Sequence, residues 1–278
     1  MTIARIEGRH LGDLPLEVEE DTELTELYCD DNQLTELPLF PKLVILEADG
    51  NQLTELPLFP KLTILYCENN RLTELPLFPK LTSLWCNDNQ LTELPPFPEL
   101  KELYCPDNQL TWLPLFPKLT SLHCENNELT ELPLFPKLTL LYCDGNRITS
   151  LPLFPKLSML SCESNELTEL PLFPKLHHLY CPDNQLTWLP LFPELTDLYC
   201  DHNQLTSLPL FPKLLHLYCQ DNPLEVVPYY PKLTEINLTG CPVAELMEDP
   251  TSVEEYHRLW KSQIENRKKS ARSTGGRS

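Results

Sequence analysis

Residues 81–99 read LTSLWCNDNQLTELPPFPE, and this nineteen-residue pattern recurs along most of the chain. The pattern keeps its phase, because an asparagine stands at every nineteenth residue from Asn32 to Asn222. The frame L-x-x-L-x-C-x-x-N-x-L-x-x-L-P-x-F-P-x fits from Leu24 to Lys232, which gives eleven full units and a twelfth partial one. A period of this length predicts a solenoid, in which each unit buries its apolar side against its neighbours.

The positions of one unit predict how each coil is built. Leucine at positions 1 and 4 and cysteine at position 6 are separated by polar or aromatic residues, which favours a short strand with one buried face. The prolines at positions 15 and 18 exclude a helix and favour an extended, polyproline-like backbone. The asparagine at position 9 is expected to bond the backbone of neighbouring turns, because an amide both donates and accepts hydrogen bonds.

This frame resembles that of leucine-rich repeat proteins. Its L-P-x-x-P ending is similar to the short subclass found in bacterial effectors, and Y-C before the asparagine with L-T-x-L-P after it also resembles repeats of large DNA viruses of amoebae. The resemblance covers residues 11–247. It implies a right-handed solenoid with a parallel β-sheet on its concave face, an extended convex side and a C-terminal capping helix.

Four segments are expected. They are an N-terminal cap at 1–23, the leucine-rich repeats at 24–247, a capping helix at 248–266 and a basic, disordered tail at 267–278. The helix is indicated by a capping-box pattern from Ser252 to Glu255, which precedes an amphipathic run. A cap is needed because a solenoid otherwise exposes its core at each end.

Two columns of side chains are predicted to fill the core. The phenylalanines at position 17 are expected to stack under the back surface. Ten cysteines occupy position 6, where Ala48 and Leu238 stand in the other coils, so cysteine acts there as a small hydrophobic residue. Cys241 replaces the asparagine of position 9 in the last coil. Neither a disulfide ladder nor a metal site is expected from a single buried column.

Composition narrows the classes of function. The net charge of −20 disfavours nucleic acid and anionic membranes, except through the basic tail. No apolar run reaches the length of a membrane span, and eleven cysteines without an export signal favour an intracellular, reducing location. His178, Asp197 and His216 fall in one row at position 3, where solvated surface is favoured over a metal site. We expect no catalytic residues, cofactor, metal or small-molecule substrate.

The exposed strand positions 3, 5, 7 and 8 are the expected binding surface, and position 5 is mostly aromatic. Exposed aromatic side chains on a rigid sheet favour protein recognition, although stacked rings also stabilise a parallel sheet, and the sequence leaves both roles open. Acidic residues at positions 7 and 8 favour a basic partner. The predicted partner-binding residues are Tyr66, Trp85, Tyr104, His123, Tyr142, Tyr180, Tyr199 and Tyr218.

The sequence therefore predicts a non-enzymatic leucine-rich repeat protein that mediates protein–protein interaction through its aromatic and acidic face. The alternative is an architectural component of a virion or another assembly, which contacts its neighbours through its ends and its basic tail. The oligomeric state and the identity of the partner are left open.

Overall fold

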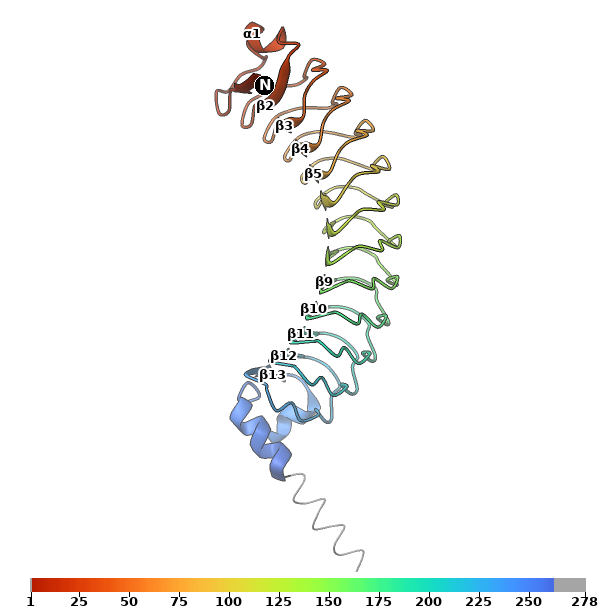
Figure 1. The fold of residues 1–278 in the computed structure, drawn as a ribbon. Helices are drawn as coiled ribbons and strands as arrows, with labels where there is room; N and C mark the ends of the chain where they lie inside the picture. Colours follow the sequence, from red (N-terminus) through yellow and green to blue (C-terminus); the bar gives the residue numbers. More distant parts are fainter. Residues whose placement is uncertain (1, 263–278) are drawn as a thin grey trace, which may run out of the picture. The chain divides into compact units, whose positions relative to one another are not determined.

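The computed structural model describes residues 2–262. The chain divides into two compact units, Met1–Leu157 and Ser158–Ser278, which are described separately. Each unit is a stack of similar coils, and each coil contributes one short strand and one extended return segment (Figure 1). The predicted solenoid of stacked coils is confirmed.

The strands of each unit lie in chain order and pair in parallel, where their pairing is described. The first unit contains β1 (Thr2–Arg5), β2 (Leu24–Tyr28), β3 (Ile45–Glu47), β4 (Ile64–Tyr66), β5 (Ser83–Trp85), β6 (Glu102–Tyr104), β7 (Ser121–His123) and β8 (Leu140–Tyr142). The second unit contains β9 (Met159–Ser161), β10 (His178–Tyr180), β11 (Asp197–Tyr199), β12 (His216–Tyr218) and β13 (Glu235–Asn237).

The register of the sheet follows the repeat. Leu84 of β5 pairs with Leu103 of β6, so residues nineteen apart in the sequence lie side by side. The central leucine of each three-residue strand is buried and its two neighbours are only partly covered. Each repeat position therefore forms a row along its unit, and the chemistry of a row is the chemistry of that position.

The interior of each coil is filled as predicted. The eleven cysteines are buried, and the ten at position 6 have no exposed surface. The phenylalanines of position 17 are 0–1% exposed, and in each unit consecutive rings stack with centroids 6.1–6.5 Å apart. Each fully buried ring is worth about 2–3 kcal/mol of transfer free energy. Tyr230 continues the row, and its hydroxyl donates to the carbonyl oxygen of Pro209 at 2.7 Å.

The asparagines of position 9 hold successive coils together. Asn127 Nδ2 donates to the carbonyl oxygens of Cys105, Cys124 and Glu125 at 3.0, 3.2 and 3.1 Å. Its Oδ1 accepts the backbone N–H of Leu110 at 2.9 Å. The side chain is thus satisfied by two coils at once, which confirms the predicted role. In the last coil, Cys241 Sγ donates to the carbonyl oxygen of Cys219 at 3.1 Å and so replaces one of these bonds.

Position 8 adopts a left-handed backbone, with φ between 49° and 54° at its non-glycine residues. Aspartate, asparagine and glycine tolerate this conformation best, which explains why they dominate the position. Gly145 has φ +63°, and a Cβ atom there would lie 2.4 Å from Oδ1 of Asn126 in the preceding coil. The left-handed backbone therefore explains the aspartates of position 8 without any role in recognition.

The return segment contains no helix between residues 24 and 241, so its predicted extended backbone is confirmed. Its leucine at position 16, between the two prolines, points outward. Nine such leucines are 47–59% exposed: Leu39, Leu58, Leu77, Leu115, Leu134, Leu153, Leu172, Leu191 and Leu210. Pro96 and Tyr229 occupy this position in the other two coils.

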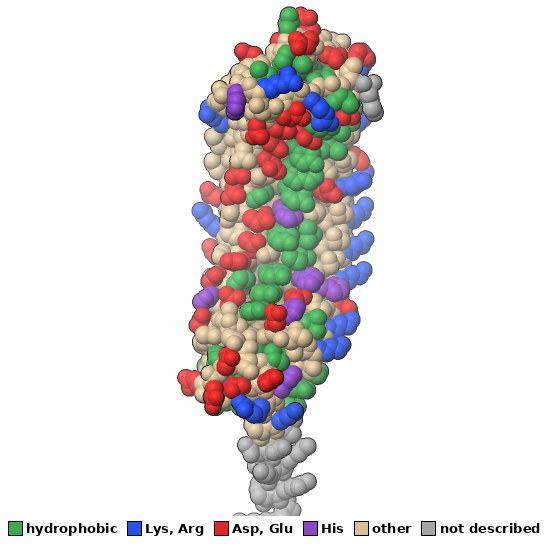
Figure 2. All heavy atoms as spheres, turned by 90° about the vertical axis from the view of Figure 1, so that its left-hand side faces the viewer, with side chains coloured by type: hydrophobic (Ala, Val, Ile, Leu, Met, Phe, Trp, Pro, Cys, Tyr) green, Lys and Arg blue, Asp and Glu red, His purple; other side chains and the backbone are tan. Residues whose placement is uncertain are grey.

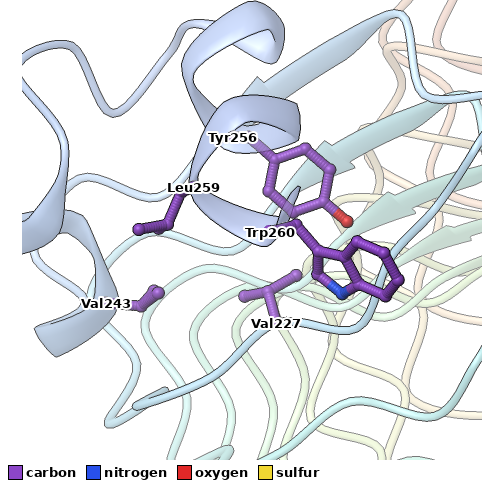
Figure 3. Close-up of a pocket in the computed structure, with 5 residues that line it drawn as sticks. All are labelled: Val227, Val243, Tyr256, Leu259 and Trp260. Atoms are coloured by element: carbon purple, nitrogen blue, oxygen red, sulfur yellow. The ribbon is translucent and has the colours of Figure 1, made fainter. Parts of the chain in front are cut away.

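Both ends of the described chain carry added elements. At the N-terminal end, β1 pairs with β2, and α1 (Leu16–Glu19) follows. At the other end, η1 (Pro242–Leu246) leads to a helix over 253–262. Figure 3 shows Tyr256, Leu259 and Trp260 of this helix beside Val227 and Val243. The Tyr256 hydroxyl accepts the backbone N–H of Tyr230 at 2.9 Å and donates to the carbonyl oxygen of Pro228.

These contacts support the proposal that the helix caps the repeats. Tyr256 is 3% exposed, and Trp260 stacks on Tyr229 with ring centroids 4.3 Å apart. The predicted end of this helix at residue 266 and the predicted tail at 267–278 lie outside the described residues.

Candidate binding face

The candidate site is the exposed face of the sheet. On the face drawn in Figure 2, hydrophobic side chains form a central strip, acidic side chains lie on one side of it, and lysines form a row on the other. The side chains of position 5 lie on this face of the sheet, where the register of the strands brings residues nineteen apart into one row.

Five predicted binding residues form one continuous stack in the first unit. The ring centroids are 4.5 Å apart for Tyr66 and Trp85, 4.8 Å for Trp85 and Tyr104, 4.2 Å for Tyr104 and His123, and 4.5 Å for His123 and Tyr142. The planes of these pairs differ by only 9–19°. The rings therefore cover one another's faces and present their edges outward.

The other three predicted residues form a second stack in the second unit. The centroids of Tyr180 and Tyr199 are 4.5 Å apart, and those of Tyr199 and Tyr218 are 4.6 Å apart. The Tyr218 hydroxyl donates to Glu235 at 2.7 Å, and this hydrogen bond raises the pKa of Tyr218 to about 12. Glu235 thereby fixes the last ring of the stack.

The stacking bears on the two roles that the sequence left open. Rings in contact along a parallel sheet stabilise neighbouring strands, so the stabilising role is present. Stacking does not prevent the rings from contacting a partner, because each of these side chains is only partly buried. The rigid stacking also lowers the entropy that a partner's binding would cost.

The coil of β7 carries an unusual set of unpaired polar atoms. His123 Nε2, Glu125 Oε2 and Ser121 Oγ are buried and have no hydrogen-bond partner among the described residues. All three belong to the binding face at positions 3, 5 and 7 of one coil. Buried polar atoms without partners are costly, and three of the four such atoms among the described residues lie on this one coil. The sequence predicts His123 as a binding residue and Glu125 as part of the acidic border, and it does not single out Ser121.

Some carboxylates of position 7 accept hydrogen bonds from backbone N–H groups of the next coil. Asp30 Oδ1 accepts the N–H of Asp49 at 2.9 Å, and Asp49 Oδ1 accepts the N–H of Glu68 at 2.7 Å. Burial raises the pKa of the Asp49 carboxyl to about 7, and the negative charges of Glu68 and Asp30 act in the same direction. The hydrogen bond from Glu68 opposes this rise without cancelling it.

Asp49→Asn is expected to stabilise the protein at pH 8 by about 1–2 kcal/mol after allowance for solvent screening, and to have little effect at pH 4. The pKa of Asp49 is higher in the folded than in the unfolded protein, so its carboxyl group disfavours folding when it is ionised. The stability that the protonated carboxyl contributes is fully present at low pH and is lost as pH rises toward 7. Asparagine keeps the acceptor and removes the charge. Urea denaturation of both proteins at several pH values measures the difference.

The matched control is Asp31→Asn, which removes a charge from an exposed neighbouring position where asparagine tolerates the left-handed backbone. Its difference from the parent protein should vary much less between pH 4 and pH 8. An Asp49→Asn difference that is the same at both pH values would contradict the assignment.

The side chains of His178, Asp197 and His216 contact one another along the row of position 3. His178 Nδ1 lies 2.7 Å from Asp197 Oδ2, and His216 Nδ1 contacts Asp197 Oδ1. Burial alone would raise the pKa of Asp197, but hydrogen bonds from Thr196 and His216 hold it below its ordinary value. Among residues 2–262, no group of three or more histidine, cysteine, aspartate or glutamate side chains is placed to hold a metal ion.

The cysteine row has the environment of a structural core. Burial raises the pKa of Cys67, Cys86, Cys105 and Cys124 well above the ordinary value. Thiols in this state are poor nucleophiles and poor metal ligands. All eleven cysteines are free thiols in the structure.

The repeats and the fold are similar to those of known proteins. The family model "Leucine Rich repeats (2 copies)" matches residues 60–99. The leucine-rich effector protein YopM from Yersinia pestis is 30% identical, with a TM-score of 0.70, over 86% of this chain and 77% of that one. The chain belongs to the leucine-rich repeat family. YopM from Yersinia enterocolitica WA-314 is 34% identical, with a TM-score of 0.68 over 82% of this chain.

This leucine-rich repeat protein spans 57% of the length of the Yersinia enterocolitica YopM chain. A leucine-rich repeat protein of Leptospira interrogans shares the fold at 23% identity, with a TM-score of 0.57 over 92% of both chains. A search of the curated proteins gave no match. Within the part of the chain that the structure describes, no helix is both long and apolar enough to cross a membrane.

Leucine-rich repeats are generally non-catalytic scaffolds, and they typically mediate protein–protein interactions. Membership of the family does not select a binding face. That choice depends on the side chains of this chain.

Proposed function

We propose that this leucine-rich repeat protein is a non-enzymatic binding protein, which holds a protein partner on the exposed face of its sheet. The observation that carries the proposal is the coil of β7, where a ring flanked by two tyrosines coincides with three unpaired buried polar atoms. The partner's segment would place hydrogen-bonding groups over Ser121, His123 and Glu125 and apolar groups against the edges of the rings.

The charge around the stack favours a basic partner. Acidic side chains line one side of the strip on the face in Figure 2, and the whole chain carries a net charge of −20. The Glu125 side chain is partly exposed beside His123, so a lysine or arginine of the partner would pair with its carboxylate. The buried thiols are compatible with a reducing, intracellular setting for this interaction.

Replacing Tyr104, His123 and Tyr142 together by alanine is expected to weaken partner binding at least about 100-fold, because these rings form the centre of the stack. A displayed library of random peptides, selected on the purified full chain, supplies defined ligands for the measurement. The selected peptides should be enriched in lysine and arginine. Their affinities are then measured by titration calorimetry.

Thr130→Ala is the control, because Thr130 is exposed on the return side of the same coil as His123 and lies outside the binding face. Ligands that bind the triple variant as tightly as the parent protein would rule out the β7 region as the binding site. Circular dichroism and thermal melting establish that the triple variant is folded. If the selected peptides were neutral or acidic, the predicted preference for a basic partner would be wrong, but the predicted binding face would not be affected.

A further inference from the structure

A second apolar surface lies on the return segments of the first unit, away from the strands. It consists of half-exposed leucines at position 16, and we name it the leucine row: Leu39, Leu58, Leu77, Leu115, Leu134 and Leu153. Six of the seven first-unit coils carry a half-exposed leucine at this position, and Pro96 occupies it in the other. Exposed apolar side chains gathered in this way often mark an interaction site.

The leucine row is bordered by rows of opposite charge. Each coil passes once around its unit, so the order of residues around the coil follows the sequence. Position 13, which is mostly glutamate, therefore lies on one side of the row, and position 19, which is mostly lysine, lies on the other. The glutamates are Glu36, Glu55, Glu74, Glu93 and Glu131, and the lysines are Lys42, Lys61, Lys80, Lys118, Lys137 and Lys156.

The symmetry of these three rows determines which partner fits them. A two-fold axis parallel to the row turns a second copy to face the first and keeps its coils at the same height. The glutamate row of each copy then faces the lysine row of the other, and the leucines meet between them. A two-fold axis across the row would instead place glutamate against glutamate.

We propose that the leucine row is an interface for a second copy of this chain, with the two copies parallel and face to face. In this arrangement Glu74 of each copy faces Lys80 of the other, and Glu131 faces Lys137, because these residues belong to the same coils. The contact is closed by symmetry and does not propagate into a filament. Successive coils of the first unit are 6.1–6.5 Å apart at the phenylalanine rings but only 4.2–4.8 Å apart at the rings of position 5, so the return side is convex and the contact is centred on the middle coils of the row.

Three coils depart from the pattern, and in the last of them Ser150 replaces the glutamate of position 13. Glu99 replaces the lysine of position 19 in one coil, but it is already paired with Lys118 at 2.5 Å. Trp112 replaces the glutamate of position 13 in the next coil and is 48% exposed, so it enlarges the apolar surface there. A groove beside Trp112 is lined by Leu94 and Pro96. The exposed lysines Lys61, Lys80, Lys137 and Lys156 remain available for the second copy.

This interface is independent of the proposed binding face, because it lies on the return segments and leaves the strands uncovered. A paired protein would therefore present two aromatic faces.

Sedimentation velocity of the full chain over the micromolar range tests the proposal. The parent protein should sediment as a dimer, and Leu77→Glu combined with Leu134→Glu should raise the dimer dissociation constant at least about tenfold. The control with the same added charge is Gln90→Glu with Gln109→Glu, at exposed positions outside the row. A parent protein that is monomeric throughout, or leucine variants that dimerise normally, would overturn the proposal.

Charge exchange tests the parallel arrangement. Glu74→Lys with Glu131→Lys should weaken the dimer, because lysine then faces lysine. Adding Lys80→Glu and Lys137→Glu should restore it, since the opposed pairs are complementary again. Failure of restoration, in variants whose circular dichroism and melting match the parent, would exclude the parallel arrangement. Leucine-row variants should still bind the peptides selected on the aromatic face, so the two proposals fail separately.

Discussion

Phe116→Ala is expected to lower the free energy of unfolding by about 3–5 kcal/mol. Phe116 has no exposed surface, and its ring lies between Phe97 and Phe135 at centroid distances of 6.3 and 6.1 Å. Truncation removes one ring from the row and leaves a cavity between two others. In a solenoid each coil contacts only its neighbours, so no distant part of the core can compensate. Urea denaturation measures the total loss.

Hydrogen exchange should show where the loss occurs. Backbone amides of the coils that hold Phe97, Phe116 and Phe135 should exchange faster, while amides near the N-terminal end keep their protection. Phe116→Leu should cost much less, because leucine fills part of the space. The exposed neighbour Thr111→Ala should change stability by less than about 0.5 kcal/mol. If Phe116→Ala also changed the free energy of unfolding by less than about 0.5 kcal/mol, that result would contradict the stacked core.

Asn127→Ala is expected to destabilise by about 2–4 kcal/mol, because it orphans buried backbone groups on two coils. The backbone N–H of Leu110 would lose its acceptor, and the carbonyl oxygen of Cys105 would lose its donor from Asn127. Alanine can replace neither bond, and the site is buried against water. The same denaturation experiment measures the loss.

The chain itself offers the matched comparison. Cys241 occupies the equivalent position in the last coil and donates to the carbonyl oxygen of Cys219. Asn127→Cys should therefore retain one of the bonds to the preceding coil and lose less stability than Asn127→Ala. Equal losses for the two variants would mean that the bond to the preceding coil contributes little.

Much of the fold was predictable because the same residue types recur at each position of the repeat. The buried cysteines, the phenylalanine row and the asparagines between coils all follow from residue chemistry at a fixed phase, and the structure confirms them. The extended return segment was predictable for the same reason, since two prolines per coil exclude a helix.

The candidate site was only partly predictable. The aromatic residues of position 5 could be named from the sequence, but their stacking at 4.2–4.8 Å could not, because it depends on side-chain orientation in a formed sheet. The unpaired atoms of Ser121 and Glu125 were missed, since the sequence gives no hydrogen-bond partners. The preference for aspartate, asparagine and glycine at position 8 was a signal for a left-handed backbone, and it was interpreted only as charge.

The sequence by itself determined the number of repeats, the inward and outward positions of most side chains and the absence of helix between the prolines, because these depend on local chemistry repeated at one period. Only the tertiary structure decided which rows touch, which polar atoms are left unpaired and that the leucine of position 16 is half exposed. Those properties arise from the closure and stacking of coils, which bring together residues that are nineteen apart and that no local pattern relates.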